Sequence, residues 1–174
     1  MKTYTGKTFN LMDIDIDCID IRDIAHALSL TCRFSGHCKE FYSVAQHSVH
    51  VSHLVPAEHA LVGLLHDAAE AYLTDIPRPF KALMPDYKAL ENYAWSVISQ
   101  RFKVPYHLPH EVKQADMQAL VTEKRDLLIK TEHQWEGLDG IEPDRSTIKP
   151  LMPRWAENQF IDRFVQLSKQ QVRV

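Results

Sequence analysis

The run Leu64-Leu65-His66-Asp67-Ala68-Ala69-Glu70 places a histidine next to an aspartate among apolar residues that are typical of a buried helix. Side chains four residues apart project from the same face of a helix, so His66 and Glu70 are expected to lie on one face. Acidic side chains removed from water are costly unless a cation compensates their charge. The run therefore predicts one half of a metal site, whose other ligands lie elsewhere in the chain.

Length, charge and cysteine content limit what the protein can be. The 174 residues fit a single domain, residues 1–174, that can bury a substantial core. A net charge of −3 without a basic stripe argues against a protein that binds duplex nucleic acid. Three cysteines cannot all pair within one chain, and they form no disulfide framework. With no signal-peptide core and no stretch of transmembrane length, we expect a cytoplasmic protein with neither membrane nor nucleic acid as partner.

Apolar periodicity predicts an all-α bundle, with a small β-hairpin at the N-terminus around Gly6. The acidic segment Asp13–Asp23 is expected to be a solvated surface loop that leads into a helix near Ile24. Ser43 and Gln46 form a capping box that opens a helix ending before Pro56. Further helices are expected at residues 57–72, 86–102, 109–129 and 155–170, with a proline-induced break at Thr74–Pro79 and a loop at residues 137–150.

The remaining ligands of the metal site are sought among histidines and acids on apolar helix faces. His47 is the leading histidine, and His50, one turn later, is its rival. Asp116 interrupts an apolar stripe, where a charge needs an explanation, although it could instead pair with Arg125 or Lys113. Two imidazoles and two carboxylates suit a divalent transition metal such as zinc, manganese, cobalt or iron. Spacing alone supports two interpretations about equally: these residues form one metal site, or each has a separate structural role.

Three further segments resemble the HD-domain phosphohydrolase superfamily, whose members are helical and bind a divalent metal through an ordered set His…His-Asp…Asp. Phe41–Ser48 resembles the helix of the first ligand in small bacterial and phage members. His66–Pro77 is similar to the same segment of YfbR-type 5′-deoxynucleotidases, and Val112–Asp116 resembles their fourth-ligand segment. The similarity spans about residues 4–128, and phage dATP triphosphohydrolases form a second similar branch.

The resemblance implies a role for each matching residue. The metal ligands would be His47, His66, Asp67 and Asp116, with Glu70 and Asp75 as catalytic acids. Arg33 and Phe34 stand where relatives carry an Arg-Trp pair that holds the nucleotide, and Lys81 stands where they carry a phosphate-binding lysine. The substrate phosphate would also be contacted by His37 and Arg78.

The expected activity is metal-dependent hydrolysis of 2′-deoxynucleoside 5′-phosphates. Phosphate esters resist hydrolysis because negative charge surrounds phosphorus, and a metal both neutralises that charge and lowers the pKa of a bound water. A second ion, Mg²⁺, could enter with the substrate phosphates. The alternatives are release of triphosphate from a dNTP and a non-catalytic nucleotide-binding regulator. The resemblance also implies a homo-oligomer, a dimer or larger, which the aromatic residues around Trp95 would suit.

Overall fold

The computed structural model describes residues 1–131, 135 and 137–171, and in this part it is all-helical. The all-α prediction is therefore confirmed. The longer helices are α1 (Ile21–Leu30), α2 (Val44–Leu54), α6 (Pro85–Phe102), α7 (His110–Leu127) and α8 (Pro153–Gln171). The short ones are α3 (Ala60–Leu65), α4 (Glu70–Leu73), α5 (Arg78–Lys81) and the 3-10 turns η1 (Ile16–Cys18), η2 (Arg33–Gly36) and η3 (Ala57–His59).

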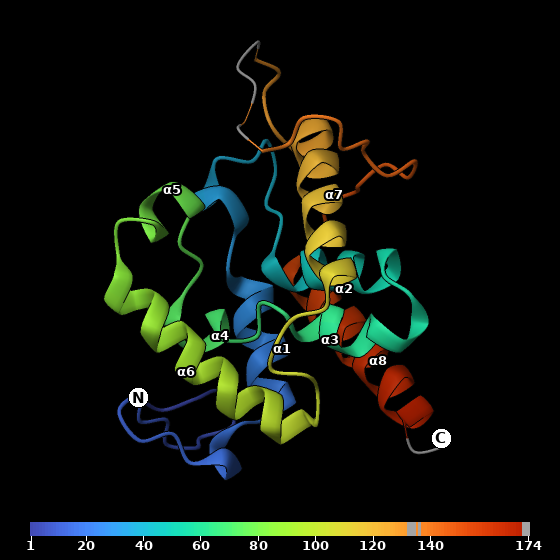
Figure 1. Cartoon of the computed structure of the whole chain (residues 1–174). Helices are drawn as coiled ribbons and strands as arrows, with labels where there is room; N and C mark the ends of the chain where they lie inside the picture. The colour runs from blue at the N-terminus through green and yellow to red at the C-terminus, as the bar shows by residue number, and fades with distance from the viewer. Residues whose placement is uncertain (132–134, 136, 172–174) are drawn as a thin grey trace.

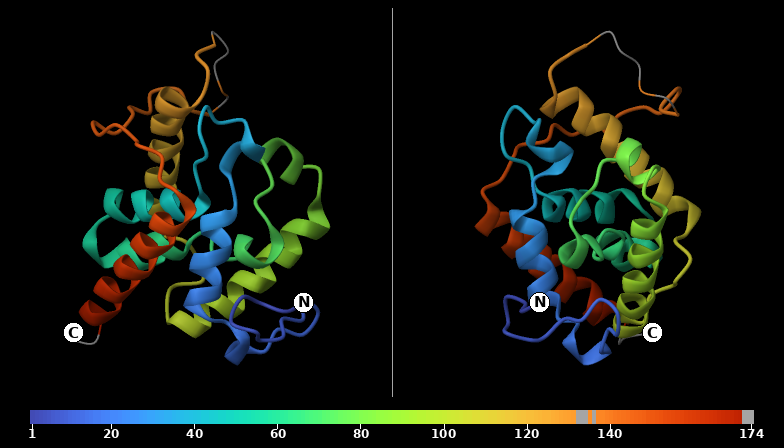
Figure 2. Two further views of the ribbon diagram at one scale, coloured as in Figure 1. Left: turned by 180° about the vertical axis from the view of Figure 1, so that it is seen from behind. Right: turned by 90° about the vertical axis from the view of Figure 1, so that its left-hand side faces the viewer.

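Helix α2 is the centre of the packing. It contacts α3, α7 and α8, while α1 packs against α4 and α8. Seen in Figures 1 and 2, α5 and α6 lie on one side of α1 and α4, and α7 and α8 lie on the other. The core joins apolar side chains from these helices, among them Leu28, Val51, Leu64, Ile98 and Phe160, all fully buried. Because α2 has neighbours on several sides, its polar residue His47 is also fully buried.

The N-terminal hairpin is reduced to a loop with one antiparallel bridge between Lys2 and Thr8, and no strand occurs among the described residues. Gly6, at φ 83°, makes the turn. Asp23 fixes this loop to α1, since its carboxylate accepts hydrogen bonds from the backbone N–H and the hydroxyl of Thr5 at 2.6 and 2.8 Å. The prediction that Asp13–Asp23 is a solvated surface segment was partly wrong, because it includes buried Ile19 and Asp23.

The capping box forms only in part. Ser43 Oγ accepts the backbone N–H of Gln46 at 3.2 Å, as predicted. The Gln46 amide does not reach back to Ser43. It donates to the carbonyl of Lys149 at 2.8 Å and accepts from the N–H of Leu151 at 2.9 Å. Gln46 thus attaches the segment before α8 to the start of α2.

The helix expected at residues 57–72 is interrupted where the histidine and aspartate lie. Residues between α3 and α4 form tight turns in which Ala68, Glu70 and Tyr72 each donate to the carbonyl three positions earlier, at 2.8–3.1 Å. Such 3-10-like turns within a helical segment often occur at functional sites. At the predicted break, Thr74 ends α4 with φ 90°, but α5 starts again at Arg78 because prolines are tolerated in a first turn.

Candidate metal centre

Four side chains from α2, the α3–α4 turn and α7 meet where the resemblance places the metal ligands. Ligand atoms of His47, His66 and Asp67 lie within 4.8 Å of one another. Asp67 Oδ2 lies 3.5 Å from His47 Nε2 and 3.2 Å from His66 Nε2. Asp116 Oδ1 lies 3.3 Å and 4.0 Å from the same two nitrogens. The structure therefore brings together residues that are up to 69 positions apart (116 − 47) in the sequence.

Hydrogen bonds behind the two imidazoles fix which nitrogen faces the cluster. His66 Nδ1 lies 2.8 Å from the carbonyl of Gly63, to which only a protonated Nδ1 can donate. His47 Nδ1 lies 2.6 Å from Glu123 Oε1 in the same way. Both Nε2 atoms are buried without a hydrogen-bond partner in the described part of the chain. A metal-bound histidine typically has this arrangement, with its second nitrogen held by a carbonyl or carboxylate.

The cluster has a negative potential that favours a cation. Burial and the charge of Arg33 act to lower the pKa of His47, but Glu123 and Asp116 outweigh them and raise it to about 9. Burial acts to raise the pKa of Asp67, yet His66, His47 and Arg33 lower it well below its usual range. The imidazoles lower the pKa of Asp116 to about 2 against the same opposing burial. Both carboxylates therefore stay ionised at neutral pH.

The residues present fit a transition-metal ion. Two ligand atoms, nitrogen or oxygen, that are each bound at about 2.0–2.1 Å in a tetrahedral site would lie about 3.4 Å apart. The nitrogen–oxygen distances of 3.2–4.0 Å in this cluster bracket that value. The imidazoles are 0% and 5% exposed, whereas the side chains of Asp67 and Asp116 are 21% and 20% exposed. The site is thus closed behind the histidines and open on the carboxylate side, as a metal site needs if it is to admit substrate.

Glu70 lies beside this cluster in an almost fully buried position. Its Oε2 has no hydrogen-bond partner among the described residues, and its Oε1 lies 3.4 Å from Lys81 Nζ. Burial, Asp67 and Asp75 raise the pKa of Glu70 well above its usual value, against the opposing charge of Lys81. Burial and Asp67 also raise the pKa of half-buried Asp75. Glu70 can therefore hold a proton under conditions in which Asp67 is ionised.

Three cations surround the carboxylates. Arg33 binds Glu123 Oε2 at 3.1 Å and lies 3.7 Å from Asp67. Arg78, which is more than half exposed, donates to Asp116 at 2.6 Å. Lys81 binds Glu91 at 2.6 Å. The alternative pairing of Asp116 with Arg125 or Lys113 was wrong, since Arg125 binds Asp126 instead.

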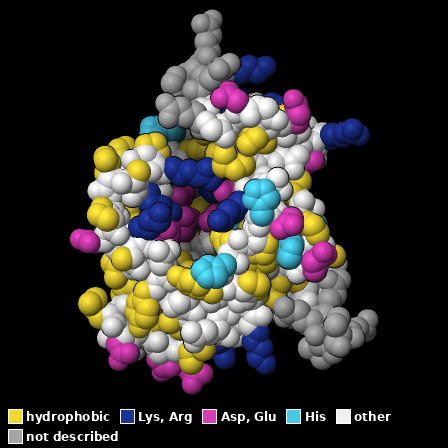
Figure 3. All heavy atoms as spheres, viewed as in Figure 1, with side chains coloured by type: hydrophobic (Ala, Val, Ile, Leu, Met, Phe, Trp, Pro, Cys, Tyr) yellow, Lys and Arg dark blue, Asp and Glu magenta, His cyan; other side chains and the backbone are white. Residues whose placement is uncertain are grey.

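Figure 3 shows the surface that these residues form. In the view of Figure 1, a hollow lies between α5 and α7, with acidic side chains in its floor and Lys and Arg side chains around its mouth. An anion that approaches the cluster would meet positive charge first. Such a rim raises the local concentration of negatively charged ligands.

Two predicted substrate contacts have different outcomes. The Phe34 ring lies 5.4 Å from Arg33 Cζ, and the backbone of Phe34 is left-handed at φ 54° and ψ 32°. Ser35 follows in the same conformation, which is costly for residues other than glycine and occurs often at functional sites. His37 is exposed and makes no side-chain hydrogen bond or ion pair within the described residues. The predicted contact of His37 with the substrate phosphate therefore stays a prediction.

Sequence reasoning left two contributors without a role. Glu123 is the fully buried partner of His47 and Arg33. Trp135 lies next to Phe34, with ring centroids 6.1 Å apart and the planes tilted by 53°. Its isolated position in a loop gave no periodic signal. Trp95 is buried within the chain and donates to the carbonyl of Tyr106, so it is a packing residue.

The chain is similar in sequence to uncharacterized proteins of two bacteria. No family model matches it. Over 170 residues it is 45% identical to the uncharacterized protein YfdR of Escherichia coli (strain K12), covering 97% of this chain and 96% of that protein. It belongs to the YfdR family. An uncharacterized protein of Rhodobacter capsulatus is 33% identical over 159 residues, which cover 86% of this chain and 79% of that protein. No helix in the described ranges has the length and apolar character needed to cross a bilayer.

Proposed function

We propose that the protein is a metal-dependent phosphohydrolase that acts on 2′-deoxynucleoside 5′-phosphates. One observation carries this proposal: His47, His66, Asp67 and Asp116 converge with both imidazole Nε2 atoms buried and without a hydrogen-bond partner among the described residues, next to a protonatable acid and under a cationic rim. These are the parts that hydrolysis of a phosphate ester needs. The resemblance to HD-domain phosphohydrolases supplies the substrate class.

Different residues have different roles in the proposed reaction. His47, His66, Asp67 and Asp116 would hold a Zn²⁺, Mn²⁺, Co²⁺ or Fe²⁺ ion, which supplies Lewis acidity and a water of lowered pKa when bound. Arg33 and Arg78 offer planar donors for phosphate oxygens, and Lys81 offers a point charge. Glu70, whose pKa is raised by burial, gives a proton to the departing oxygen, and Asp75 orients the water.

The nucleoside has an aromatic surface next to the phosphate position. The Phe34 ring adjoins Arg33, and Trp135 adjoins Phe34. Base–aromatic stacking contributes about 1–3 kcal/mol per base and tolerates different bases. This pair supplies stacking where related enzymes carry one tryptophan.

The second candidate is a triphosphohydrolase that releases triphosphate from a dNTP. The exposed guanidinium of Arg78 favours it, since a longer phosphate chain would need cations further out along the rim. A regulator that binds nucleotide without turnover is the third candidate. Buried, unpartnered Glu70 Oε2 argues against it, because a binding site alone has no need of a protonated acid.

Product analysis distinguishes these candidates. The metal-stripped protein is reloaded with Mn²⁺ or Co²⁺ and incubated with the deoxy- and ribonucleoside mono- and triphosphates of the four common bases. We expect phosphate release from deoxynucleoside monophosphates only after reloading. Release of triphosphate would identify the second candidate, and tight binding without any product would identify the third. Undiminished turnover by the stripped protein would contradict all metal-dependent schemes.

A matched pair of variants tests the role of Glu70. Glu70→Gln should lower kcat by about 10²- to 10⁴-fold, the range of general acid–base catalysis, while the metal content is unchanged. Glu157→Gln is the control. Glu157 lies on α8, is partly exposed, pairs with His26, and is not part of the cluster. Equal activity of both variants would remove Glu70 from the mechanism.

A further inference from the structure

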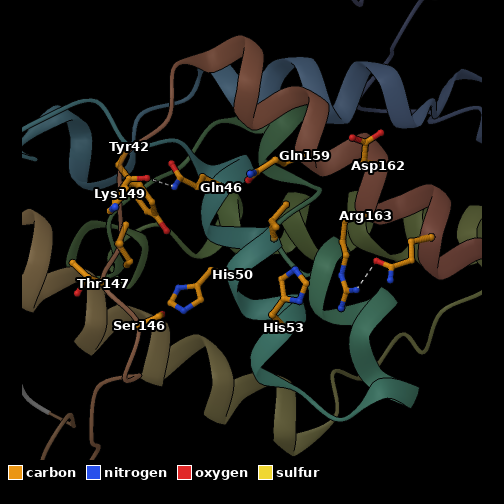
Figure 4. A pocket seen from close by; sticks show the side chains of 13 residues that line it. Tyr42, Gln46, His50, His53, Ser146, Thr147, Lys149, Gln159, Asp162 and Arg163 are labelled. Atoms are coloured by element: carbon orange, nitrogen blue, oxygen red, sulfur yellow. Dashed lines mark hydrogen bonds between the residues drawn. The ribbon is translucent and has the colours of Figure 1, made fainter.

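A second cavity lies on another side of α2, between α2, α8 and the segment of residues 144–149. Its volume is about 450 Å³, within the usual size of small-molecule sites. Its walls include His50, His53, Ser146, Lys149, Gln159 and Arg163. Figure 4 shows His50 and His53 one turn apart on α2, with Ser146 next to His50 and Arg163 next to His53. None of the proposed metal ligands or catalytic acids lines this cavity. His50, the rival ligand of the sequence analysis, therefore belongs to a different site.

Arg163 is the main anion-binding group in the wall. Its guanidinium is held in place, because Nε and Nη2 donate to the hydroxyl and carbonyl oxygens of Ser52 at 3.0 and 2.9 Å and Nη1 donates to Gln166 at 2.8 Å. These bonds use three of the five N–H donors that an arginine carries. No carboxylate pairs with Arg163 in the described part of the chain, and burial alone lowers its pKa. A positioned cation without a counter-charge favours an oxyanion.

Two imidazoles and a lysine extend this polar wall. Both ring nitrogens of His50 are buried without a hydrogen-bond partner, although Asp144 Oδ2 lies 3.5 Å from its Nε2. Unsatisfied buried polar atoms destabilise the fold unless a ligand or water binds them. Lys149 is exposed, and its ammonium makes no ion pair with a described residue. Asp162 is the only carboxylate among the described lining residues, so Lys149 and Arg163 leave the wall net positive.

We propose that this cavity is a binding site for a small organic molecule that carries an oxyanion, a phosphate or a carboxylate. Arg163 and Lys149 bind the anionic group, and His50 and His53 bind adjacent polar atoms. A single phosphate ion would fill only part of about 450 Å³. The remaining space suits a hydroxyl-rich body of the size of a sugar, which the amide of Gln159 can bind and for which Ser146 Oγ, whose own proton is donated to Asp144, can act as an acceptor. The proposal is independent of the activity proposed for the metal centre.

The cavity wall is attached to the helix that supports the candidate metal centre. Thr122 Oγ1 accepts the backbone N–H of Asp144 at 2.8 Å, and Arg125 donates to the carbonyls of Asp144 and Ser146 at 2.7 and 2.6 Å. Asp126 accepts the N–H of Ile148 at 2.9 Å. Residues 144–148 are therefore attached to the turn of α7 that contains Glu123.

The test is a set of ¹H–¹⁵N NMR titrations of the whole protein with inorganic phosphate, ribose 5-phosphate and gluconate. Backbone amides of residues 53 and 146–149 report on the cavity, and those of residues 66–68 report separately on the metal centre. Saturable shifts of the first group with phosphate compounds alone identify a phosphate site. Saturation with gluconate alone identifies a carboxylate site, and either result supports the proposal.

Variants link the binding to named residues. Arg163→Gln should weaken binding of the saturating probe about 10-fold or more, because it removes a charge-assisted hydrogen bond. Lys149→Gln should weaken it by a smaller factor, because its ammonium is exposed, and it cannot disturb the bonds of Arg163 to α2. Lys169→Gln, an exposed lysine of α8 that does not line the cavity, should change nothing. Shifts confined to residues 66–68, or equal affinities in the Lys149 and Lys169 variants, would overturn the proposal.

Discussion

Glu123 is fully buried and joins two residues of the candidate metal centre. Its Oε1 lies 2.6 Å from His47 Nδ1, and its Oε2 accepts from Arg33. Burial acts to raise its pKa, but Arg33 and His47 lower it, so Glu123 stays ionised. It therefore determines both the ring orientation of His47 and the side of that ring which carries the proton. His47 cannot act as a ligand through Nε2 unless Nδ1 keeps this proton.

The first prediction concerns this bond. Glu123→Gln should weaken binding of Co²⁺ or Zn²⁺ by about 10- to 100-fold, the usual effect of removing a group that orients a ligand. The measurement is a competition titration against a chelator of known affinity, together with the visible absorption of bound Co²⁺. Glu111→Gln on the same helix is the control, because Glu111 is exposed and contacts only His59, at 3.7 Å. If both variants bind metal equally, Glu123 does not position His47.

Single residues differ in how far the sequence could reveal them. His66 and Asp67 stand out because a charged pair inside an apolar run demands an explanation. Asp116 stands out for the same reason on α7. Glu123 has no such signal, because its partners His47 and Arg33 lie 76 and 90 positions away along the chain. Only the packing of α2 against α7 reveals its role.

The C-terminal end of helix α6 has a strained backbone. Lys103 ends α6 in the left-handed conformation, with φ 54° and ψ 43°, and its N–H bonds to carbonyls of the last turn. Glycine is preferred at this position because it has no Cβ. The side chain of Lys103 is exposed and makes no hydrogen bond or ion pair with a described residue. The strain at Lys103 is therefore not offset by a side-chain contact.

The second prediction follows from that geometry. Lys103→Gly should raise the free energy of unfolding by about 0.5–1 kcal/mol, because relief of the left-handed strain outweighs the greater freedom of glycine in the unfolded chain. Urea denaturation followed by circular dichroism measures the change. Lys103→Ala is the control, since alanine keeps the Cβ and with it the strain. A glycine variant no more stable than the alanine variant would contradict the assignment.

Elements with a long apolar period could be predicted well, and short ones could not. The starts expected for α6 and α8 differ from the observed ones by one and two residues, because Pro85 and Pro153 occupy first turns rather than precede them. The break between α3 and α4 consists of hydrogen bonds from each N–H to the carbonyl three residues earlier. These bonds leave the spacing of apolar residues unchanged, so the sequence pattern did not reveal the break. α5 is shorter than any reliable period, so the break expected at Thr74–Pro79 overlaps its first two residues, Arg78 and Pro79.

At the scale of the whole molecule, α2 connects two polar sites within one core. Its residue His47 faces the candidate metal centre, and His50, three positions later, lines the second cavity. The segment of residues 144–149 lies between α7 and α8 in the chain, is hydrogen-bonded to α7, and contributes residues 146–149 to the cavity wall. Gln46 attaches the end of this segment to α2. This segment is therefore hydrogen-bonded to both α2 and α7.

The last prediction concerns how pH affects this connection. Asp126 accepts from Arg125 Nε and Nη2 at 2.7 and 2.8 Å and from the N–H of Ile148. The bonds to Arg125, more than the opposing burial, lower the pKa of Asp126 below its usual range. A carboxyl with a lowered folded-state pKa stabilises the fold above its ordinary pKa of about 4, and this stabilisation is lost as the pH falls through the lower value. Asp126→Asn should therefore be less stable than the wild type at pH 7, by a margin that shrinks toward pH 3 in urea denaturation.

The matching control is Asp139→Asn, an exposed residue whose side chain makes no hydrogen bond or ion pair among the described residues. Its margin to the wild type should be small and should not change with pH. If the Asp126 variant differs from the wild type by the same amount at pH 7 and pH 3, the carboxylate does not hold residues 144–148 to α7. In that case the hydrogen bonds of Thr122 and Arg125 alone must hold the segment, and they do not depend on protonation in this range.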